Sequence, residues 1–402
     1  MKREILIPEY LTNFSCIGAA CEDTCCAGWK VTVDKAAFHK YRNVKTPGIK
    51  DELKKNITRE RSNPSDATYG KIKMNEKNEC TLLTEEGWCK IHAELGEEFL
   101  CNTCSVYPRN FNEIDTRIEK SLTPSCPEAA RLILLNEEGI GFIIDEERTN
   151  TNVLTVGQIQ SNDNLFFWDL RMFTIEMLQN RKQAFEVRLI IIGMFLQKLH
   201  EIPRGNWSTQ LEPLMQRYKN VLEDDAQIKL LLNLPQNLSF QMNMAKELVK
   251  YRLTGGVSSQ RYLDCLNDML KALHLNDESD INESTELYKR FYTEYYAPFM
   301  NNHEYILENY AVNYVFKNLF PFDQPNIFES YVMLVVNISM IKLHLIGMAG
   351  HHKGLTIELV IKLIQSYAKT IEHNPNYLLN VRKMLQESGY STMAHMIVLL
   401  KS

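Results

Sequence analysis

CIGAACEDTCC, residues 16–26, carries four of the ten cysteines of this 402-residue chain. Five more follow, at Cys80, Cys89, Cys101, Cys104 and Cys126. The remainder of the chain contains only Cys265. Because cysteine is reactive and rarely abundant, nine of them in the first third of a chain need a physical reason. Disulfides, metal ligation and buried structural thiols are the three possible reasons.

The amino-terminal residues disfavour disulfides. Residues 1–10 read MKREILIPEY, whose apolar run is only three residues long, so we expect no secretory signal and a cytoplasmic protein. A chain of this length can also bury a sizeable core without covalent staples. In a reducing compartment, such a cluster of cysteines indicates metal binding or catalysis instead.

The spacing of the cysteines predicts a metal site. Cys101-Asn-Thr-Cys104 allows one turn of chain to present two sulfurs to one metal, and Cys21-x3-Cys25-Cys26 offers a second close group. We therefore predict four thiolate ligands from the tightest spacings: Cys21, Cys25, Cys101 and Cys104. Further ligands would come from the remaining thiols, in the order Cys26, Cys80 and Cys89, then Cys16 and Cys126.

The identity of the metal stays open at this point. Zinc sites and [4Fe–4S] clusters both use four cysteines, and nine cysteines allow two sites or one site with additional thiols. His92, three residues after Cys89, is expected to support the site or lie at the surface rather than ligate. Cys265 is expected to be a small buried hydrophobe. The pair His351-His352 is expected in a solvated loop.

Composition excludes other classes of protein. The chain is 45% hydrophobic and 24% charged, as in ordinary globular proteins, and its net charge of -5 gives no footprint for nucleic acid. Its longest apolar stretch, residues 331–349, is interrupted by Asn337, Lys342 and His344. We therefore expect a buried helix there and no membrane insertion. The sequence indicates no oligomeric state.

The chain changes character near residue 150. Before it, only residues 29–33 and 69–74 look like strands, and we predict that metal ligation contributes to folding. After it, apolar residues recur at helical spacing. The predicted helices are 166–177, 185–199, 211–232, 245–253, 259–273, 286–296, 304–319, 328–348, 356–373 and 376–400. The predicted fold is mostly α: a cysteine-rich metal-binding module with little β-structure over 1–150, then an all-helical substrate- or partner-binding domain over 151–402.

Several segments together resemble one known family. Residues 7–42, IPEYLTNFSCIGAACEDTCCAGWKVTVDKAAFHKYR, resemble the start of flagellin lysine N-methylases, within a broader group of cysteine-rich zinc- or iron-chelating proteins. The resemblance continues through residues 80–83 (CTLL), 88–92 (WCKIH), 101–109 (CNTCSVYPR), 121–127 (SLTPSCP), 306–314 (ILENYAVNY) and 320–322 (FPF). It implies methyl transfer from S-adenosylmethionine to lysines of flagellin, with an iron–sulfur cluster, expected to be [4Fe–4S].

The residues themselves leave the mechanism open. There is no glycine-rich strand-to-helix turn for S-adenosylmethionine, and Cys21-x3-Cys25-Cys26 matches only the first gap of a radical-enzyme motif. An iron with an open position could chelate the cofactor; otherwise the metal is structural and the cofactor binds the helical domain. Asp23, Tyr107 and Asp115 are candidate bases, although a surface or structural role is favoured for each.

The sequence leaves open the role of a tyrosine series and whether the chain is an enzyme. A series of tyrosines could line a channel for the substrate lysine through cation–π attraction, but their helical spacing favours a role in helix packing. The series consists of Tyr288, Tyr292, Tyr295, Tyr296, Tyr305, Tyr310 and Tyr314. In place of an enzyme, the chain could be a non-catalytic zinc- or iron-binding adaptor or redox sensor whose helical domain binds a partner.

Overall fold

The computed structural model describes residues 2–62, 64–115, 117–148, 157–159, 164–275 and 280–401, and it divides into two compact units. The helical unit comprises Met1–Phe14, Phe111–Ser125 and Ala129–Ser402. The cysteine unit comprises Ser15–Asn110 and Cys126–Glu128. Residues 1–14, 111–125 and those from 129 to 150 thus join the helical unit, although the sequence assigned them to the amino-terminal module. The predicted boundary at 150/151 lies outside the described residues.

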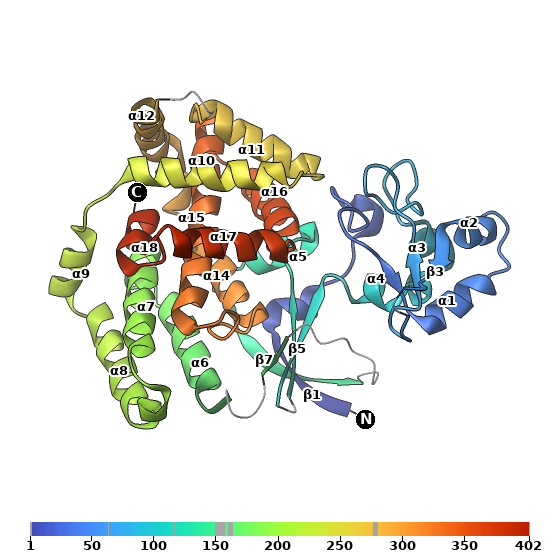
Figure 1. The fold of residues 1–402 in the computed structure, drawn as a ribbon, viewed down its shortest axis with the longest axis horizontal. Coiled ribbons are helices and arrows are strands. Elements are labelled where there is room, and N and C mark those ends of the chain that lie inside the picture. Colours follow the sequence, from blue (N-terminus) through green and yellow to red (C-terminus); the bar gives the residue numbers. More distant parts are fainter. Residues whose placement is uncertain are drawn as a thin grey trace. The chain divides into compact units, whose positions relative to one another are not determined.

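Helices form most of the helical unit, which confirms the mostly α prediction (Figure 1). They are α6 (Phe167–Leu178), α7 (Phe185–His200), α8 (Trp207–Leu222), α9 (Asp225–Leu232), α10 (Leu238–Thr254), α11 (Gln260–Ala272), α12 (Ile281–Phe291), α13 (Ala297–Met300), α14 (Tyr305–Lys317), α15 (Ile327–His352), α16 (Ile357–Tyr367), α17 (Pro375–Glu387) and α18 (Met393–Leu400), with α5 (Pro127–Leu134) before them. Two π-helical turns, Tyr292–Tyr296 and Ala368–Glu372, follow α12 and α16.

One predicted helix is divided by a capping residue. The segment predicted as 211–232 forms α8 and α9, because the Asp224 side chain accepts hydrogen bonds from the backbone N–H groups of Ala226 and Gln227. A side chain that satisfies the free N–H groups of a first turn starts a new helix at that point. The segment predicted as 376–400 is divided likewise, since Thr392 caps α18 through the N–H of His395.

The helical unit also contains a five-stranded sheet that the sequence did not predict. Its order is β7-β1-β6-β5-β8, formed by β7 (Phe142–Arg148), β1 (Lys2–Pro8), β6 (Arg117–Leu122), β5 (Arg109–Ile114) and β8 (Gly157–Ile159). β1 pairs parallel to β6 and antiparallel to β7, so the sheet is mixed. The prediction of an all-helical domain after residue 150 is wrong at β8, which pairs with β5.

Asparagine and tyrosine side chains join α14 to this sheet. The Asn313 amide donates to the carbonyl of Leu122 on β6 at 3.2 Å, and Asn313 Oδ1 accepts from the Tyr10 hydroxyl at 2.5 Å. Asn112 of β5 donates to the carbonyl of Lys317 at the end of α14, at 2.9 Å. Buried polar groups satisfied in this way fix one register between a helix and a sheet.

α15 is the central helix of the helical unit. Its 26 residues are apolar and long enough to cross a membrane, but 94% of the most apolar window is buried inside the protein, as predicted for residues 331–349. Gly193 on α7 allows close approach, since a Cβ there would lie 2.2 Å from Cζ of Tyr331. The polar interruptions have partners: the Asn337 amide donates to the carbonyl of Met333 at 2.9 Å, and Lys342 pairs with Glu186.

His344 of α15 should make stability depend on pH. Burial lowers the pKa of His344 to about 4, below its ordinary value of 6.5. Between those values the unfolded chain binds the extra proton, so stability is complete above pH about 6.5 and falls as the pH drops toward 4. At 1.36 kcal/mol per pKa unit, the loss between pH 7 and pH 5 is on the order of 2 kcal/mol.

The variant His344→Gln provides the measurement of this loss. Urea unfolding, followed by helical circular dichroism, gives the free energy of unfolding at pH 7 and at pH 5. The decrease in this free energy between the two pH values should be smaller for the variant than for the unaltered protein by roughly 2 kcal/mol. All other titrating groups are common to the two proteins. An identical pH dependence for both would contradict the prediction.

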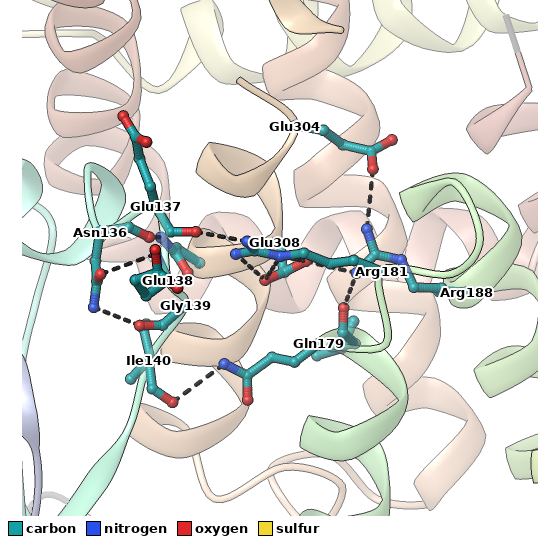
Figure 2. A network of polar contacts seen from close by, with 12 residues as sticks. Asn136, Glu137, Glu138, Gly139, Ile140, Gln179, Arg181, Arg188, Glu304 and Glu308 are labelled. Atoms are coloured by element: carbon teal, nitrogen blue, oxygen red, sulfur yellow. Dashed lines mark hydrogen bonds and ion pairs between the residues drawn. The ribbon is translucent and has the colours of Figure 1, made fainter. Parts of the chain in front are cut away.

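A buried ion network ties α6, α7 and α14 together (Figure 2). Glu308 of α14, only 1% exposed, accepts hydrogen bonds from Arg181 at 2.9 Å and from Arg188 at 2.6 Å. Arg188 is also 1% exposed and pairs with Glu304 at 3.0 Å. The Gln179 amide donates to the carbonyl of Ile140 at 3.2 Å, which attaches the loop before β7 to the end of α6.

Candidate metal centre

All nine clustered cysteines belong to the cysteine unit. Its elements are a three-stranded sheet, β2 (Thr32–Val33), β4 (Gly70–Ile72) and β3 (Ile57–Arg59), and the helices α1 (Lys35–Arg42), α2 (Ile49–Asn56), α3 (Lys90–Leu95) and α4 (Asn102–Val106). The predicted strands 29–33 and 69–74 correspond to β2 and β4. The unit's core includes the thiols themselves, since Cys26, Cys80 and Cys101 are 7%, 5% and 1% exposed.

Backbone pairing brings three thiol-bearing segments together. Isolated bridges join Ala27 to Glu79 and Leu83 to Cys89, and the amide of Cys80 donates to the carbonyl of Cys26 at 2.7 Å. The side chains of Cys26, Cys80 and Cys89 consequently interact, although 54 residues (80 − 26) separate the first two. Cys25 lies beside them, with its Sγ 3.8 Å from that of Cys26.

The CxxC pair is held by a buried aspartate. Cys101 precedes α4 as its N-cap, and the amide of Cys104 donates to the Cys101 carbonyl at 2.9 Å, so one turn presents both sulfurs. Asp34 caps α1 through the amide of Ala37 and also accepts from the amide of Asn102, both at 2.9 Å. A carboxylate that binds two backbone N–H groups fixes both helix starts. The sequence analysis missed Asp34; an Asp at an N-cap position was the available signal.

Hydrogen bonds between the thiols shift their pKa values in opposite directions. Hydrogen bonding from the Cys26 thiol lowers the pKa of Cys89 to about 6 and also lowers the pKa of Cys80. Hydrogen bonding from Cys104 likewise lowers the pKa of Cys101. The thiols that donate these hydrogen bonds have raised pKa values. A hydrogen bond with Cys25 raises the pKa of Cys26, and a hydrogen bond with Cys101 raises the pKa of Cys104.

This donor set fits a thiolate-bound metal centre. The lowered pKa values of Cys80, Cys89 and Cys101 favour their thiolate forms, and negative charge in a largely buried core would need a cation to compensate it. Four-cysteine zinc and iron–sulfur sites both match the donors. His92 supports the group from α3, since its backbone N–H and its charge both lower the pKa of Cys89.

Exposure does not separate the other predicted ligands from this group. Cys16 is exposed, but so is Cys25, and Cys21 and Cys126 are half-buried like Cys89 and Cys104. Burial, ahead of nearby charges, raises the pKa of Cys21. Interactions between the thiols bring together Cys25, Cys26, Cys80, Cys89, Cys101 and Cys104. Their role as ligands stays a prediction. Cys265 is fully buried on α11, as expected for a structural thiol.

The three candidate bases belong to different units: Asp23 and Tyr107 to the cysteine unit, and Asp115 to the helical unit. Asp23 accepts a hydrogen bond from the Thr24 amide at 2.8 Å, and the Tyr107 ring centroid lies 6.0 Å from that of Trp29. Asp115 belongs to the helical unit, in the turn between β5 and β6, with a φ of 56°. A catalytic role for any of them stays a prediction.

The tyrosine series lies in packed helices, as the packing interpretation predicted. Tyr288, Tyr296, Tyr310 and Tyr314 are buried, and the stacked rings of Tyr288 and Tyr292 have centroids 6.4 Å apart. One lysine does lie over this series, but it is the protein's own: Lys342 Nζ is 5.7 Å from the Tyr292 ring centroid.

A second polar group in the helical unit escaped the sequence analysis. Glu372 ends the π-helical turn Ala368–Glu372, and it accepts from the Tyr310 hydroxyl at 2.8 Å and pairs with Lys317 at 3.1 Å. The side chains of Glu372 and Lys317 are only 4% and 11% exposed. π-Helical turns often mark functional positions, and the only sequence signal here was a charged residue in an apolar helix.

A thiol-rich unit joined to a mixed sheet and a large helical assembly defines a cysteine-rich, mostly α class of protein. Residues 171–399 match the FliB lysine N-methylase C-terminal domain, which is more than half of the chain. The chain belongs to the FliB lysine N-methylase family, as the sequence resemblance predicted.

Known proteins similar to this chain carry related names. The Lysine-N-methylases of Salmonella choleraesuis (strain SC-B67) and Salmonella typhimurium (strain LT2) are each 25% identical to it over 391 residues, 94% of both chains. The Flagellar biosynthetic protein FliU of Salmonella muenchen is 37% identical over 136 residues, 34% of this chain and 79% of FliU. No solved structure matches.

Proposed function

We propose that this protein is a protein-lysine N-methyltransferase that uses S-adenosylmethionine, acts on flagellin, and holds an iron–sulfur cluster on its cysteines. The observation that carries the proposal is similarity to lysine N-methylases along 94% of the chain. The name of the FliU relative supports a flagellar substrate. The chemistry of the thiol group supports the cluster, with zinc as the alternative metal.

The proposed reaction forms a bond between nitrogen and carbon and breaks one between carbon and sulfur. The neutral lysine amine attacks the methyl carbon of S-adenosylmethionine, and the electrons of the C–S bond remain on the sulfur of the departing S-adenosylhomocysteine. The proton of the lysine ammonium must leave first, and burial of the ammonium lowers its pKa toward that end. The protein must therefore hold the two reactants in line and exclude water.

The cysteine unit supplies the residues for the cluster. The proposed thiolate ligands are Cys80, Cys89 and Cys101, whose pKa values are lowered, with Cys25, Cys26 and Cys104 beside them. When bound, a cluster with one open iron position would chelate the amino and carboxylate groups of S-adenosylmethionine. Asp34 orients the CxxC turn through two backbone hydrogen bonds. We further propose a cytoplasmic location, where these thiols stay reduced.

Mass spectrometry of flagellin tests the proposal. Protein purified anaerobically, with its metal and sulfide measured, is incubated with flagellin and S-adenosylmethionine that carries a deuterated methyl group. We expect deuterated methyl groups on flagellin lysines and an equal amount of S-adenosylhomocysteine. Flagellin whose lysines were first blocked by acetylation is the matched control. Unmodified flagellin in the presence of fully metal-loaded protein would refute the enzyme and favour the adaptor.

A further inference from the structure

Two histidines and one aspartate meet on the helical unit where α15 ends. The Nε2 atom of His352 lies 3.0 Å from one carboxylate oxygen of Asp268, and the Nε2 atom of His351 lies 3.4 Å from the other. One donor atom from each of the three residues lies within 4.8 Å of the other two. His351 and His352 are exposed as expected, but the expectation of a loop is wrong, because both residues complete the last turn of α15.

Close packing of α11 against α15 creates this arrangement. A Cβ at Gly347 would lie 2.6 Å from Cγ of Met269, so glycine permits the backbones to approach at that level. His351 follows Gly347 by one helical turn on the same face, and Asp268 adjoins Met269. The buried Met269 fixes how α11 packs on α15. This packing places the Asp268 carboxylate opposite the imidazole rings of His351 and His352.

We propose that Asp268, His351 and His352 form a binding site for a divalent transition metal, with Zn²⁺ the best match. Zinc bonds to imidazole nitrogen and carboxylate oxygen of about 2.0–2.1 Å place tetrahedral ligand atoms roughly 3.3 Å apart. The 3.0 and 3.4 Å separations, each to a different carboxylate oxygen, are close to that spacing, and all three donor atoms lie within 4.8 Å of one another. Two histidines and a carboxylate leave the fourth position for water.

The surroundings admit a cation. The side chains of His351 and His352 are 37% and 36% exposed, and that of Asp268 is 21% exposed, so an ion can reach all three. Partial negative charge at the carboxyl end of a long helix also favours a cation there. A simple histidine–aspartate ion pair with this exposure contributes little to stability, so replacing it by metal bonds costs little.

This site consists only of residues of α11 and α15, so the proposal does not rest on the thiol centre or on the proposed function. Bound zinc would connect α11 to α15 and stabilise the folded state by mass action. The protein should therefore bind a second metal ion at this site, and substitutions of the clustered cysteines should not remove it.

Zinc titration of the complete protein, with its thiol centre already loaded, tests the proposal. Equilibrium dialysis with Zn²⁺ should show one equivalent fewer for His351→Ala/His352→Ala than for the unaltered protein. Asp268→Asn, which keeps the shape of the side chain, should also lose this equivalent or bind it at least about tenfold more weakly. His200→Ala removes another exposed histidine at a helix end and should keep the full stoichiometry.

A second measurement identifies the ligands. Co²⁺ in place of Zn²⁺ should give a visible spectrum without thiolate charge-transfer bands, and His351→Ala/His352→Ala should lack it. Zinc should also raise the unfolding temperature of the unaltered protein more than that of the double variant. Equal zinc stoichiometry in the unaltered protein and a folded double variant would overturn the proposal, leaving only a histidine–aspartate ion pair.

Discussion

The double variant Cys101→Ser/Cys104→Ser should lose both the proposed metal and the proposed methylation of flagellin lysines. Cys101 directly precedes α4 and Cys104 lies within it, and hydrogen bonding with Cys104 lowers the pKa of Cys101. A serine hydroxyl is not deprotonated at neutral pH and is a poor ligand for a soft metal site. Since loss of outer partners alone costs 10–100-fold, loss of two direct ligands should reduce activity by at least about 100-fold.

The measurement combines bound iron, sulfide and zinc with the methyl count on flagellin. Cys265→Ala is the matched control, because Cys265 is a buried thiol of α11 whose pKa is raised to about 11 by burial, which marks it as unreactive. That control should retain metal and activity. A fully loaded Cys101→Ser/Cys104→Ser protein would show that the ligands are other cysteines. A metal-depleted variant with full activity would instead separate methyl transfer from the metal.

Glu308→Gln should strongly destabilise the helical unit. It keeps the shape of the side chain but leaves the guanidinium of Arg188, 1% exposed, without the carboxylate 2.6 Å away. Breaking a buried pair by removing one partner costs about 3–5 kcal/mol, because an uncompensated charge remains inside the protein. Glu304 keeps part of the compensation, so we expect about 3 kcal/mol.

Urea unfolding followed by helical circular dichroism checks this value. Glu201→Gln is the control, because its pair with Lys198 joins side chains that are 55% and 50% exposed. Exposed pairs contribute about 0–1 kcal/mol, so the control should remain close to the unaltered protein. A Glu308→Gln protein as stable as the control would mean that the network of Figure 2 contributes no net charge stabilisation.

The candidate metal centre was only partly predictable from spacing. Cys101 and Cys104 share one turn, so their proximity followed directly from sequence. Cys26 was ranked after Cys21, yet the structure places it against Cys25, Cys80 and Cys89. That convergence depends on backbone bridges between segments some fifty residues apart, such as the pairing of Ala27 with Glu79. Spacing along a chain carries no information on such pairing.

The sequence by itself determined the helices of this protein and its concentration of thiols. Apolar residues at helical spacing located α6 and α7 within a residue or two, because that pattern is local and repeats over several turns. The family followed from motifs that are likewise local.

Only the tertiary structure decided the five-stranded sheet and the contacts across it. β1 pairs Ile5 with Ile118 and with Asp145, more than a hundred residues away, and a short alternation such as Ile5-Leu6-Ile7 specifies no partner. The same reason applies to Asp268 and His351, which are 83 residues (351 − 268) apart and meet only because α11 packs on α15. A helix arises from contacts within a few residues, whereas sheets and polar sites depend on long-range packing, which no single segment encodes.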